Sequence, residues 1–204
     1  QSLKEFLFLK ENIKKNIFNI IEIGAGYGRT CHTFLSLNNN LKKYLIIDFP
    51  EMLSLSSRYL KKVLDNENFK KISFIDASQN LNNIAELNLK NCLTININSF
   101  NEMSDDAFNI YIELINKIGG FFYTKNPVAK FNDPDITTNI KRKKIALNTG
   151  QIKKIINIFD EKELNKSKKN YVQTYLPSTK WKIISIKFSR PLIYYLQALY
   201  EKKN

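Results

Sequence analysis

Three glycines follow an apolar segment and an acidic residue near the start of the chain. The run Ile20-Ile-Glu-Ile-Gly-Ala-Gly-Tyr-Gly-Arg29 places Glu22 two residues before Gly24. Glycine is needed where the backbone turns at positive φ and comes within contact distance of a ligand, and the helix expected next offers free N–H groups at its start. The run therefore predicts a loop that binds a nucleotide-type cofactor.

The spacing of these glycines argues against a dinucleotide. A G-x-G-x-x-G loop needs a third small residue at position 29, where close packing supports a pyrophosphate, but that position holds Arg29 and the glycine falls at Gly28. We therefore favour a cofactor without a pyrophosphate. An ordinary strand–turn–helix and an NAD site are the alternatives.

Single polar residues follow three later apolar runs. Asp48 follows the second run, Asp76 the third and Asn98 the fourth. Ligands of parallel α/β sheets bind beyond the carboxyl ends of the strands, and an acid there can accept hydrogen bonds from both hydroxyls of a ribose. Asp48, 22 residues after Gly26, is our candidate for that contact. The alternative is that Asp48 and Asp76 only cap helices or form turns.

These candidates must be positioned by strands and helices that alternate as far as residue 124. Apolar runs predict strands at 17–23, 44–47, 72–75, 93–97 and 120–124. Helical spacing predicts helices at 3–17, 29–37, 52–64 and 105–118. Such alternation is typical of a doubly wound, mostly parallel α/β sheet with helices on both faces.

The rest of the chain has a different pattern. A polar, basic stretch extends to Thr149, and we expect a helix near 151–159. The apolar runs 181–188 and 192–200 predict a closing hairpin, although the second run also fits a helix by periodicity. No internal repeat or second domain is evident. The first residue is Gln1 and not methionine, so we expect the sequence to be part of a longer chain.

The motifs together resemble a family of known enzymes. The E-x-G-x-G-x-G pattern beginning at Glu22 resembles the first motif of class I S-adenosylmethionine (SAM) methyltransferases. The segments Glu22–Thr30, Asp48-Phe-Pro50 and Ser99-Phe-Asn-Glu-Met103 are similar to the sugar O-methyltransferase family of bacterial polysaccharide and capsule gene clusters. The resemblance covers about residues 17–126. It implies a Rossmann-like sheet of seven strands with an antiparallel strand at its C-terminal end.

The resemblance also implies a domain organisation and a cofactor. We expect one SAM-binding domain over residues 1–204, with a packing helix at 1–16 and an acceptor-side region at 127–180. SAM would be the cofactor and S-adenosylhomocysteine (SAH) the product. The residues expected to contact SAM are Glu22, Gly24, Ala25, Gly26, Tyr27, Arg29, Asp48, Phe49, Asp76, Ala77, Asn98 and Ser99.

Individual roles can be suggested for some of these residues. Asp76 matches the family position that commonly bonds the exocyclic amine of adenine, and an acid such as Glu22 suits a cationic ligand. Arg29 could bind the cofactor carboxylate or an anion of the acceptor. The alternative for Arg29 is a solvated position on the helix surface. Tyr27 could pack over the cofactor.

Methyl transfer to a hydroxyl also needs a base within hydrogen-bond reach of that hydroxyl, although positioning supplies much of the acceleration. Glu102, after the fourth predicted strand, is our first candidate, and its alternative is a carboxylate that stabilises a helix start. His32, the only histidine, is the second candidate, with a surface or packing role as its alternative. Tyr123 and Asn126 could line the acceptor side.

The segment after the fourth strand also bears on the acceptor. Enzymes that methylate amino groups of adenine or glutamine carry an Asn/Asp-Pro-Pro-Tyr/Phe run there, and Asn98-Ser-Phe-Asn101 is not such a run. We therefore expect an oxygen or another non-aromatic acceptor. The resemblance suggests a carbohydrate or a related small anionic precursor of a surface polysaccharide, with a phosphate-like oxygen as an alternative.

The charge of the chain suggests nucleic acid at first, but its composition argues otherwise. The formal net charge is +13, yet only four of the 32 basic residues are arginine, the residue better suited to bidentate phosphate recognition. A local cluster could still meet an anionic acceptor, and it comprises Lys125, Lys130, Lys141, Arg142, Lys143 and Lys144.

Cysteine and hydropathy patterns suggest the setting. Cys31 and Cys92 lack metal-ligand spacing, so we expect no metal and a reduced, cytoplasmic environment. No apolar run approaches the roughly 20 residues of a membrane span. The favoured function is SAM-dependent O-methylation of a small molecule. The rival functions are an RNA or DNA methyltransferase, an NAD-type oxidoreductase and a non-catalytic SAM-fold module.

Overall fold

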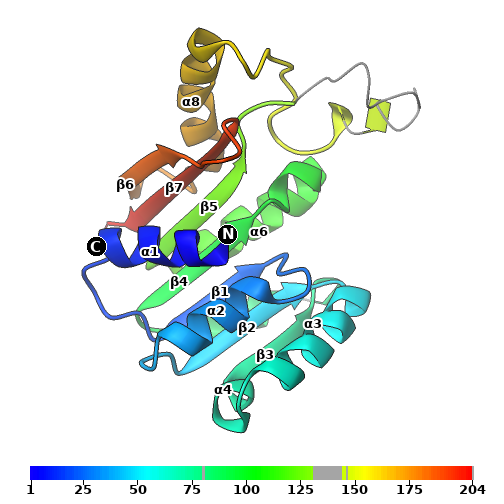
Figure 1. The fold of residues 1–204 in the computed structure, drawn as a ribbon, viewed down its shortest axis with the longest axis vertical. Helices are drawn as coiled ribbons and strands as arrows, with labels where there is room; N and C mark the ends of the chain where they lie inside the picture. Colours follow the sequence, from blue (N-terminus) through cyan, green and yellow to red (C-terminus); the bar gives the residue numbers. More distant parts are fainter. Residues whose placement is uncertain (80, 131–143, 146, 204) are drawn as a thin grey trace.

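The protein forms one seven-stranded sheet covered by helices on both faces (Figure 1). This computed structural model describes residues 1–204 except 80, 131–143, 146 and 204. The strand order is β3-β2-β1-β4-β5-β7-β6. The strands are β1 (Asn19–Ile23), β2 (Lys43–Asp48), β3 (Ile72–Asp76), β4 (Cys92–Ile97), β5 (Phe121–Pro127), β6 (Trp181–Phe188) and β7 (Tyr195–Lys202). The first five strands are parallel, and β7 pairs antiparallel with both β5 and β6. The predicted fold class is therefore confirmed.

The strand order places a reversal between β1 and β4. The chain runs outward from β1 to β2 and β3, then returns to β4 beside β1 and continues to β5 in the other direction. Loops leaving the carboxyl ends of β1 and β4 consequently turn to opposite faces of the sheet, and a crevice opens between them. This switch point is where a ligand of an open α/β sheet is expected.

Helices and apolar side chains form a layer on each face. The helices are α1 (Ser2–Asn12), α2 (Arg29–Leu37), α3 (Pro50–Val63), α4 (Asn66–Lys70), α5 (Asn82–Glu86), α6 (Asp105–Ile118) and α8 (Glu161–Tyr175), with a 3₁₀ turn, η1, at Phe100–Glu102. One core cluster joins α1, α2 and α3 to the sheet, and the other joins α5, α6 and α8 to its opposite face. No helix in the described part of the chain is long and apolar enough to cross a membrane.

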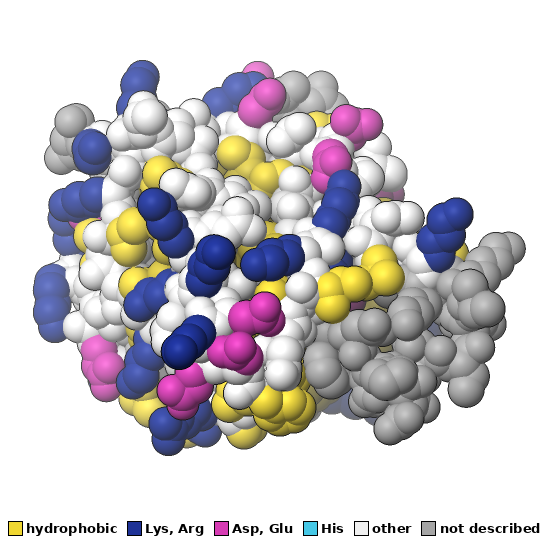
Figure 2. All heavy atoms as spheres, turned by 90° about the horizontal axis from the view of Figure 1, so that it is seen from above, with side chains coloured by type: hydrophobic (Ala, Val, Ile, Leu, Met, Phe, Trp, Pro, Cys, Tyr) yellow, Lys and Arg dark blue, Asp and Glu magenta, His cyan; other side chains and the backbone are white. Residues whose placement is uncertain are grey.

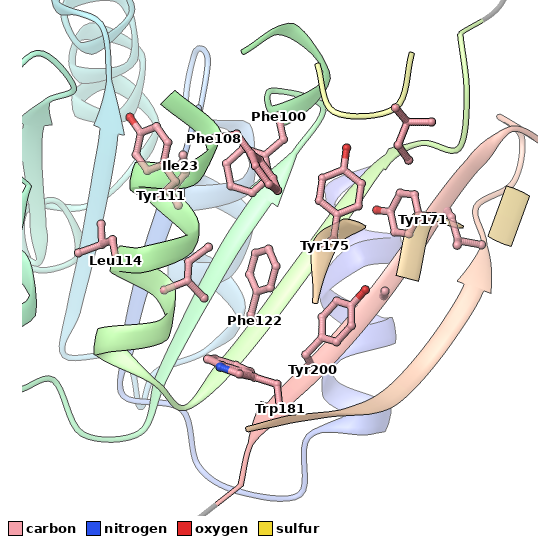
Figure 3. Packing of buried hydrophobic residues seen from close by; sticks show 14 of the residues in the cluster. Ile23, Phe100, Phe108, Tyr111, Leu114, Phe122, Tyr171, Tyr175, Trp181 and Tyr200 are labelled. Atoms are coloured by element: carbon pink, nitrogen blue, oxygen red, sulfur yellow. The ribbon is translucent and has the colours of Figure 1, made fainter. Parts of the chain in front are cut away.

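Aromatic side chains dominate the core under α6 and α8. Phe100 lies parallel to Tyr175, with 6.2 Å between ring centroids, and contacts Phe108 edge to face at 5.1 Å. Figure 3 shows these rings, with Phe122 and Tyr171, meeting between the sheet and the two helices. The packing fixes η1 and the start of α6, and both carry residues that line the crevice.

The N-terminal helix is anchored by a buried ion pair. The carboxylate of Glu5 in α1 lies 2.6 Å from the Nζ of Lys125 in β5, and their side chains are only 1% and 3% exposed. The sequence suggested that Lys125 belongs to a basic cluster that could meet an anionic acceptor. This prediction is wrong for Lys125, because its ammonium group is buried against Glu5. Lys141, Arg142 and Lys143 of that cluster lie outside the described residues.

The region after β5 differs from its prediction. The expected helix at 151–159 is wrong, because Ile155 pairs with Lys130 in an isolated bridge and the segment is extended or turned. Its apolar residues Ile152, Ile156 and Ile158 are buried in the core cluster of α6 and α8. The helix begins later, where the Asp160 side chain accepts hydrogen bonds from the amides of the first turn of α8. The run 192–200, which by its pattern fitted either a strand or a helix, belongs largely to the strand β7.

Candidate functional site

A cavity of about 900 Å³ lies at the carboxyl ends of β1, β2 and β4. Its described lining comes from the glycine loop, the end of β2, the turn after β3, the segment from Ile97 to Ser104, the start of α6 and the β6–β7 connection. Residues from several separate parts of the chain therefore meet at the switch point of the sheet.

Gly24 and Gly26 are needed in the glycine loop for two different structural reasons. Gly24 has a φ of +73°, and a Cβ there would lie 2.3 Å from the Oγ of Ser99, so the loop packs directly against the segment after β4. Gly26 has a φ of +57°, and among the described residues a Cβ there would have only the Met52 Cε as a near neighbour, at 4.0 Å. Because Gly26 also lines the cavity, its backbone is open to a ligand.

Asp48 joins the glycine loop to the end of β2. Its Oδ2 accepts a hydrogen bond from the Gly26 amide at 2.9 Å, and its Oδ1 accepts one from the Phe49 amide at the same distance. The side chain lines the cavity. Each carboxylate oxygen can accept a second hydrogen bond, so Asp48 retains capacity for a ligand hydroxyl.

Glu22 forms part of the buried floor of the cavity. It is 2% exposed, and its Oε2 accepts a hydrogen bond from the Tyr44 hydroxyl at 2.8 Å. Burial raises the pKa of Glu22 to about 7, and the hydrogen bonds from Tyr44 and Thr30 oppose this effect.

Arg29 and two aromatic residues complete the side of the cavity formed by β1 and β2. The Arg29 Nε is buried and has no hydrogen-bond partner among the described residues. The rings of Tyr27 and Phe49 are exposed, and both line the cavity. This side therefore combines an unpaired guanidinium donor with apolar surface.

The segment after β4 is held by hydrogen bonds to the first strand. The Asn96 Nδ2 and the Ser99 Oγ both donate to the carbonyl of Ile23, at 3.1 Å and 3.0 Å. The Asn126 Nδ2 in turn donates to the Asn96 Oδ1 at 2.8 Å. The carbonyl just before the glycine loop is thus fixed by donors from β4 and its loop.

Asn98 and Tyr195, which both line the cavity, are joined by a hydrogen bond. Asn98 has a φ of +61°, which is uncommon for a residue other than glycine, and its Oδ1 accepts from the Tyr195 hydroxyl. Tyr195 lies at the start of β7 and was not foreseen as a site residue, since no local pattern marks it. Glu102, in η1, is exposed and lines the same side.

Two of the predicted site residues are engaged elsewhere. His32 does not line the cavity, because its Nδ1 shares a hydrogen bond of 2.9 Å with the hydroxyl of Tyr59 in α3. The Asp76 Oδ1 accepts from the amide and the hydroxyl of Ser78, both at 2.8 Å, and these bonds lower its pKa. Ala77, the next residue, lines the cavity instead. Asp76, the last residue of β3, therefore uses its carboxylate to hold the turn that follows the strand and is not part of the described lining.

The two residues expected on the acceptor side lie behind the cavity. Tyr123 is fully buried, and its hydroxyl donates to the Gln197 Oε1 at 2.9 Å. Asn126 is also fully buried, and it bonds Asn96 and Thr124. Neither side chain is part of the described lining.

The charges at the cavity differ in sign from the charge of the whole chain. Its described lining carries three carboxylates, those of Glu22, Asp48 and Glu102, and one basic side chain, Arg29. On the end of the molecule seen from above in Figure 2, lysine and arginine side chains are spread among acidic and apolar ones without forming a continuous patch. Among the described residues, no group of three or more His, Cys, Asp or Glu side chains could hold a metal ion.

Solved structures of methyltransferases share this fold over nearly the whole chain. The glycopeptide N-methyltransferase MtfA, in complex with sinefungin, matches with a TM-score of 0.64 and 9% identity over 98% of this chain and 93% of that one. The methyltransferase domain of bacterial CtHen1 matches with a TM-score of 0.60 and 11% identity over 98% and 96%.

A third structure matches over a smaller part of its own length. An O-methyltransferase family protein from Burkholderia thailandensis has a TM-score of 0.55 and 10% identity, over 100% of this chain and 57% of that one. No family model and no curated protein matches the chain. The structural likeness, at such low identity, shows that the chain has the class I methyltransferase fold.

Proposed function

We propose that this protein is a SAM-dependent O-methyltransferase that acts in the cytoplasm on a hydroxyl of a carbohydrate precursor of a bacterial capsule or surface polysaccharide. One observation carries the proposal. The glycine loop, tied to Asp48, and the carboxylate of Glu102 face a single cavity at the switch point of the sheet. A cofactor and an acceptor with a general base can thus meet there.

The residues on the β1–β2 side fit SAM. Gly26 leaves its backbone open to a ligand, Asp48 can accept hydrogen bonds from ribose hydroxyls, and Arg29 has a buried donor free for a carboxylate. Ala77, Phe49 and Tyr27 offer surfaces for an aromatic base or an apolar chain. SAM, when bound, supplies an electrophilic methyl group on a positively charged sulfonium. The protein's task is then to position and deprotonate the acceptor.

Glu102 is the residue we assign as general base. Glu102 is exposed and lines the cavity, and it lies in η1, which the buried ring of Phe100 anchors in the core. A carboxylate oxygen there can accept the proton of an acceptor hydroxyl as the new bond forms. Asn98 and Tyr195, joined by their own hydrogen bond, can orient that hydroxyl.

The part of the cavity lining that surrounds Glu102 favours an uncharged acceptor over an anionic one. From Ile97 to Tyr195, the described lining includes Glu102 and no basic side chain. Lys130 donates to the carbonyl of Asn101 at 3.0 Å, and Lys153 pairs with Asp105 at 3.1 Å, so two nearby cations are engaged on protein groups. Anionic precursors, phosphate-like oxygens and nucleic acid therefore receive less support than a sugar hydroxyl.

Calorimetry followed by a transfer assay tests the function. SAH should bind with micromolar affinity, while NAD, titrated in parallel, should not bind. Transfer of a labelled methyl group from SAM should then be measured to neutral glycosides, nucleotide-linked sugars, uronic acids and RNA. Failure to bind SAH would refute the proposal, and binding without transfer to any acceptor would favour a non-catalytic module.

A further inference from the structure

A second cavity, of about 380 Å³, lies beside the amino ends of β1 and β4, at the opposite end of these strands from the first cavity. We call it the amino-end cavity. Its described lining comes from the second half of α1, the α1–β1 connection, the end of α2 and the loop after α2. These two helices cover the same face of the sheet (Figure 1). The amino-end cavity shares no described lining residue with the first cavity, and the proposed function leaves it unused.

The floor of the amino-end cavity is apolar. The rings of Phe6 in α1 and Phe34 in α2 meet edge to face, with 5.2 Å between their centroids. Leu93 of β4 is buried, whereas Leu37 at the end of α2 is 50% exposed. An exposed leucine beside a hollow gains free energy when a ligand covers it. An inorganic ion would leave this surface in water, so we expect a ligand with an apolar portion.

The rim of the amino-end cavity is basic. Its described lining includes Lys10, Lys14 and Lys15 and no carboxylate. The first cavity has the opposite balance, with three carboxylates and one arginine in its described lining. Asparagine carboxamides add N–H donors to the rim without adding negative charge, and they belong to Asn16, Asn38, Asn39 and Asn40. The amino-end cavity is therefore complementary to an anion.

The three lysines are not equally available to a ligand. Lys15 is paired with Glu201 at 2.7 Å, and Lys14 donates one of its three protons to the carbonyl of Glu11 at 2.7 Å. Lys10 has no hydrogen bond or ion pair with another described residue. Its place in the last turn of α1 favours a cation there, but does not account for the apolar hollow beside it. Lys10 and the remaining donors of Lys14 are thus left for an anion.

We propose that the amino-end cavity is a binding site for a small organic anion. Its carboxylate or phosphate group contacts Lys10 and Lys14, and its apolar portion lies over the floor beside Leu37. The cavity volume falls in the lower part of the range of about 300–1,000 Å³ that is usual for small-molecule sites. A lysine ammonium pairs with either head group as a point charge. The site is independent of SAM and of the methyl acceptor.

Titrations followed by NMR of the ¹⁵N-labelled protein test the site, because amide shifts report where a ligand binds. The probes are phenyl phosphate and phenylacetate, with benzyl alcohol as the neutral ligand and inorganic phosphate as the head group alone. Both organic anions should shift the amides of Lys10, Leu37 and Asn39, with a Kd on the order of 1 mM. Benzyl alcohol and inorganic phosphate should bind about tenfold more weakly. The tighter organic anion identifies the preferred head group.

Two exposed lysines of α1 provide a matched pair of variants. Lys10→Gln should weaken both organic anions about 3- to 10-fold and leave benzyl alcohol unchanged, because only the charged contact is lost. Lys4→Gln removes the same charge outside both described linings and should leave every Kd unchanged. Leu37→Ser should weaken the anions and the alcohol alike, through lost apolar contact.

Three results would overturn the inference. They are an absence of shifts around the amino-end cavity, equal affinity for phenylacetate and benzyl alcohol, and an unchanged Kd for the anions in Lys10→Gln. Shifts confined to the glycine loop would also overturn it, because they would place the anions in the first cavity. None of these results bears on the proposed function, which depends on SAH binding and methyl transfer.

Discussion

The carboxylate of Asp48 accepts a hydrogen bond from the amide of Gly26 at 2.9 Å, although the two residues are 22 positions apart in the chain. The end of β2 and the glycine loop are thus held as one unit at the edge of the cavity. Because the same carboxylate can still accept hydrogen bonds from a ligand, this contact makes Asp48 the first residue to test.

Asp48→Ala should weaken SAH binding by about 1.5–3 kcal/mol, since a hydrogen-bonded charged partner of the ligand is lost and the loop loses an anchor. That corresponds to roughly a 10- to 150-fold increase in Kd. Calorimetry measures the effect. Asp65→Asn is the control, because Asp65 caps α4 away from the cavity. Unchanged affinity in Asp48→Ala would exclude the ribose contact.

Glu102→Gln should retain SAH affinity and lose turnover by about 10²- to 10⁴-fold, because the amide cannot take the proton of the acceptor hydroxyl. The measurement is kcat with the acceptor found in the transfer assay. Glu113→Gln provides a matched control on the exposed face of α6. Equal turnover in the wild type and Glu102→Gln would remove Glu102 as the base.

His32→Gln should leave both SAH affinity and turnover nearly unchanged, because His32 bonds Tyr59 and does not line the cavity. Its stability should fall by about 0.5–1.5 kcal/mol through the lost hydrogen bond. Urea unfolding and kinetics on the same preparation test both statements. A 100-fold loss of kcat with unchanged stability would restore His32 as a catalytic candidate.

Breaking the pair between Glu5 and Lys125 should cost about 3–5 kcal/mol of stability, because either single substitution leaves a buried charge without its partner. Lys125→Met should therefore unfold at a much lower urea concentration. Replacing both residues by apolar ones should recover most of the loss. The exposed pair of Lys70 and Glu67 is the comparison, and Glu67→Gln should change stability by less than about 1 kcal/mol.

The stability of the folded protein should depend on pH through Glu22. Its pKa rises from 4.5 to about 7 on folding, so between these values the folded state binds more protons than the unfolded state. Stability contributed by this group therefore falls as the pH rises through that window. Glu22→Gln should remove a dependence on the order of 3 kcal/mol between pH 4.5 and 8. Identical pH profiles for both proteins would contradict the assignment.

The local part of the site was predictable because its signals lie within a few residues of one another. Glycine spacing indicated the loop at Gly24 and Gly26, and apolar periodicity placed helices at 29–37 and 105–118 with the bounds that the structure shows. Periodicity failed at 151–159. There, tertiary packing holds an extended segment whose isoleucines are spaced as in a helix.

The sequence by itself determined the fold class, the glycine loop, and the polar residues at the strand ends, because short-range steric and hydrophobic patterns specify these features. Only the tertiary structure decided which side chains meet. Tyr195 reaches Asn98 across 97 positions and Lys125 reaches Glu5 across 120. Such contacts depend on strand order and register, which bring distant segments together and leave other candidates, such as His32, bonded outside the cavity.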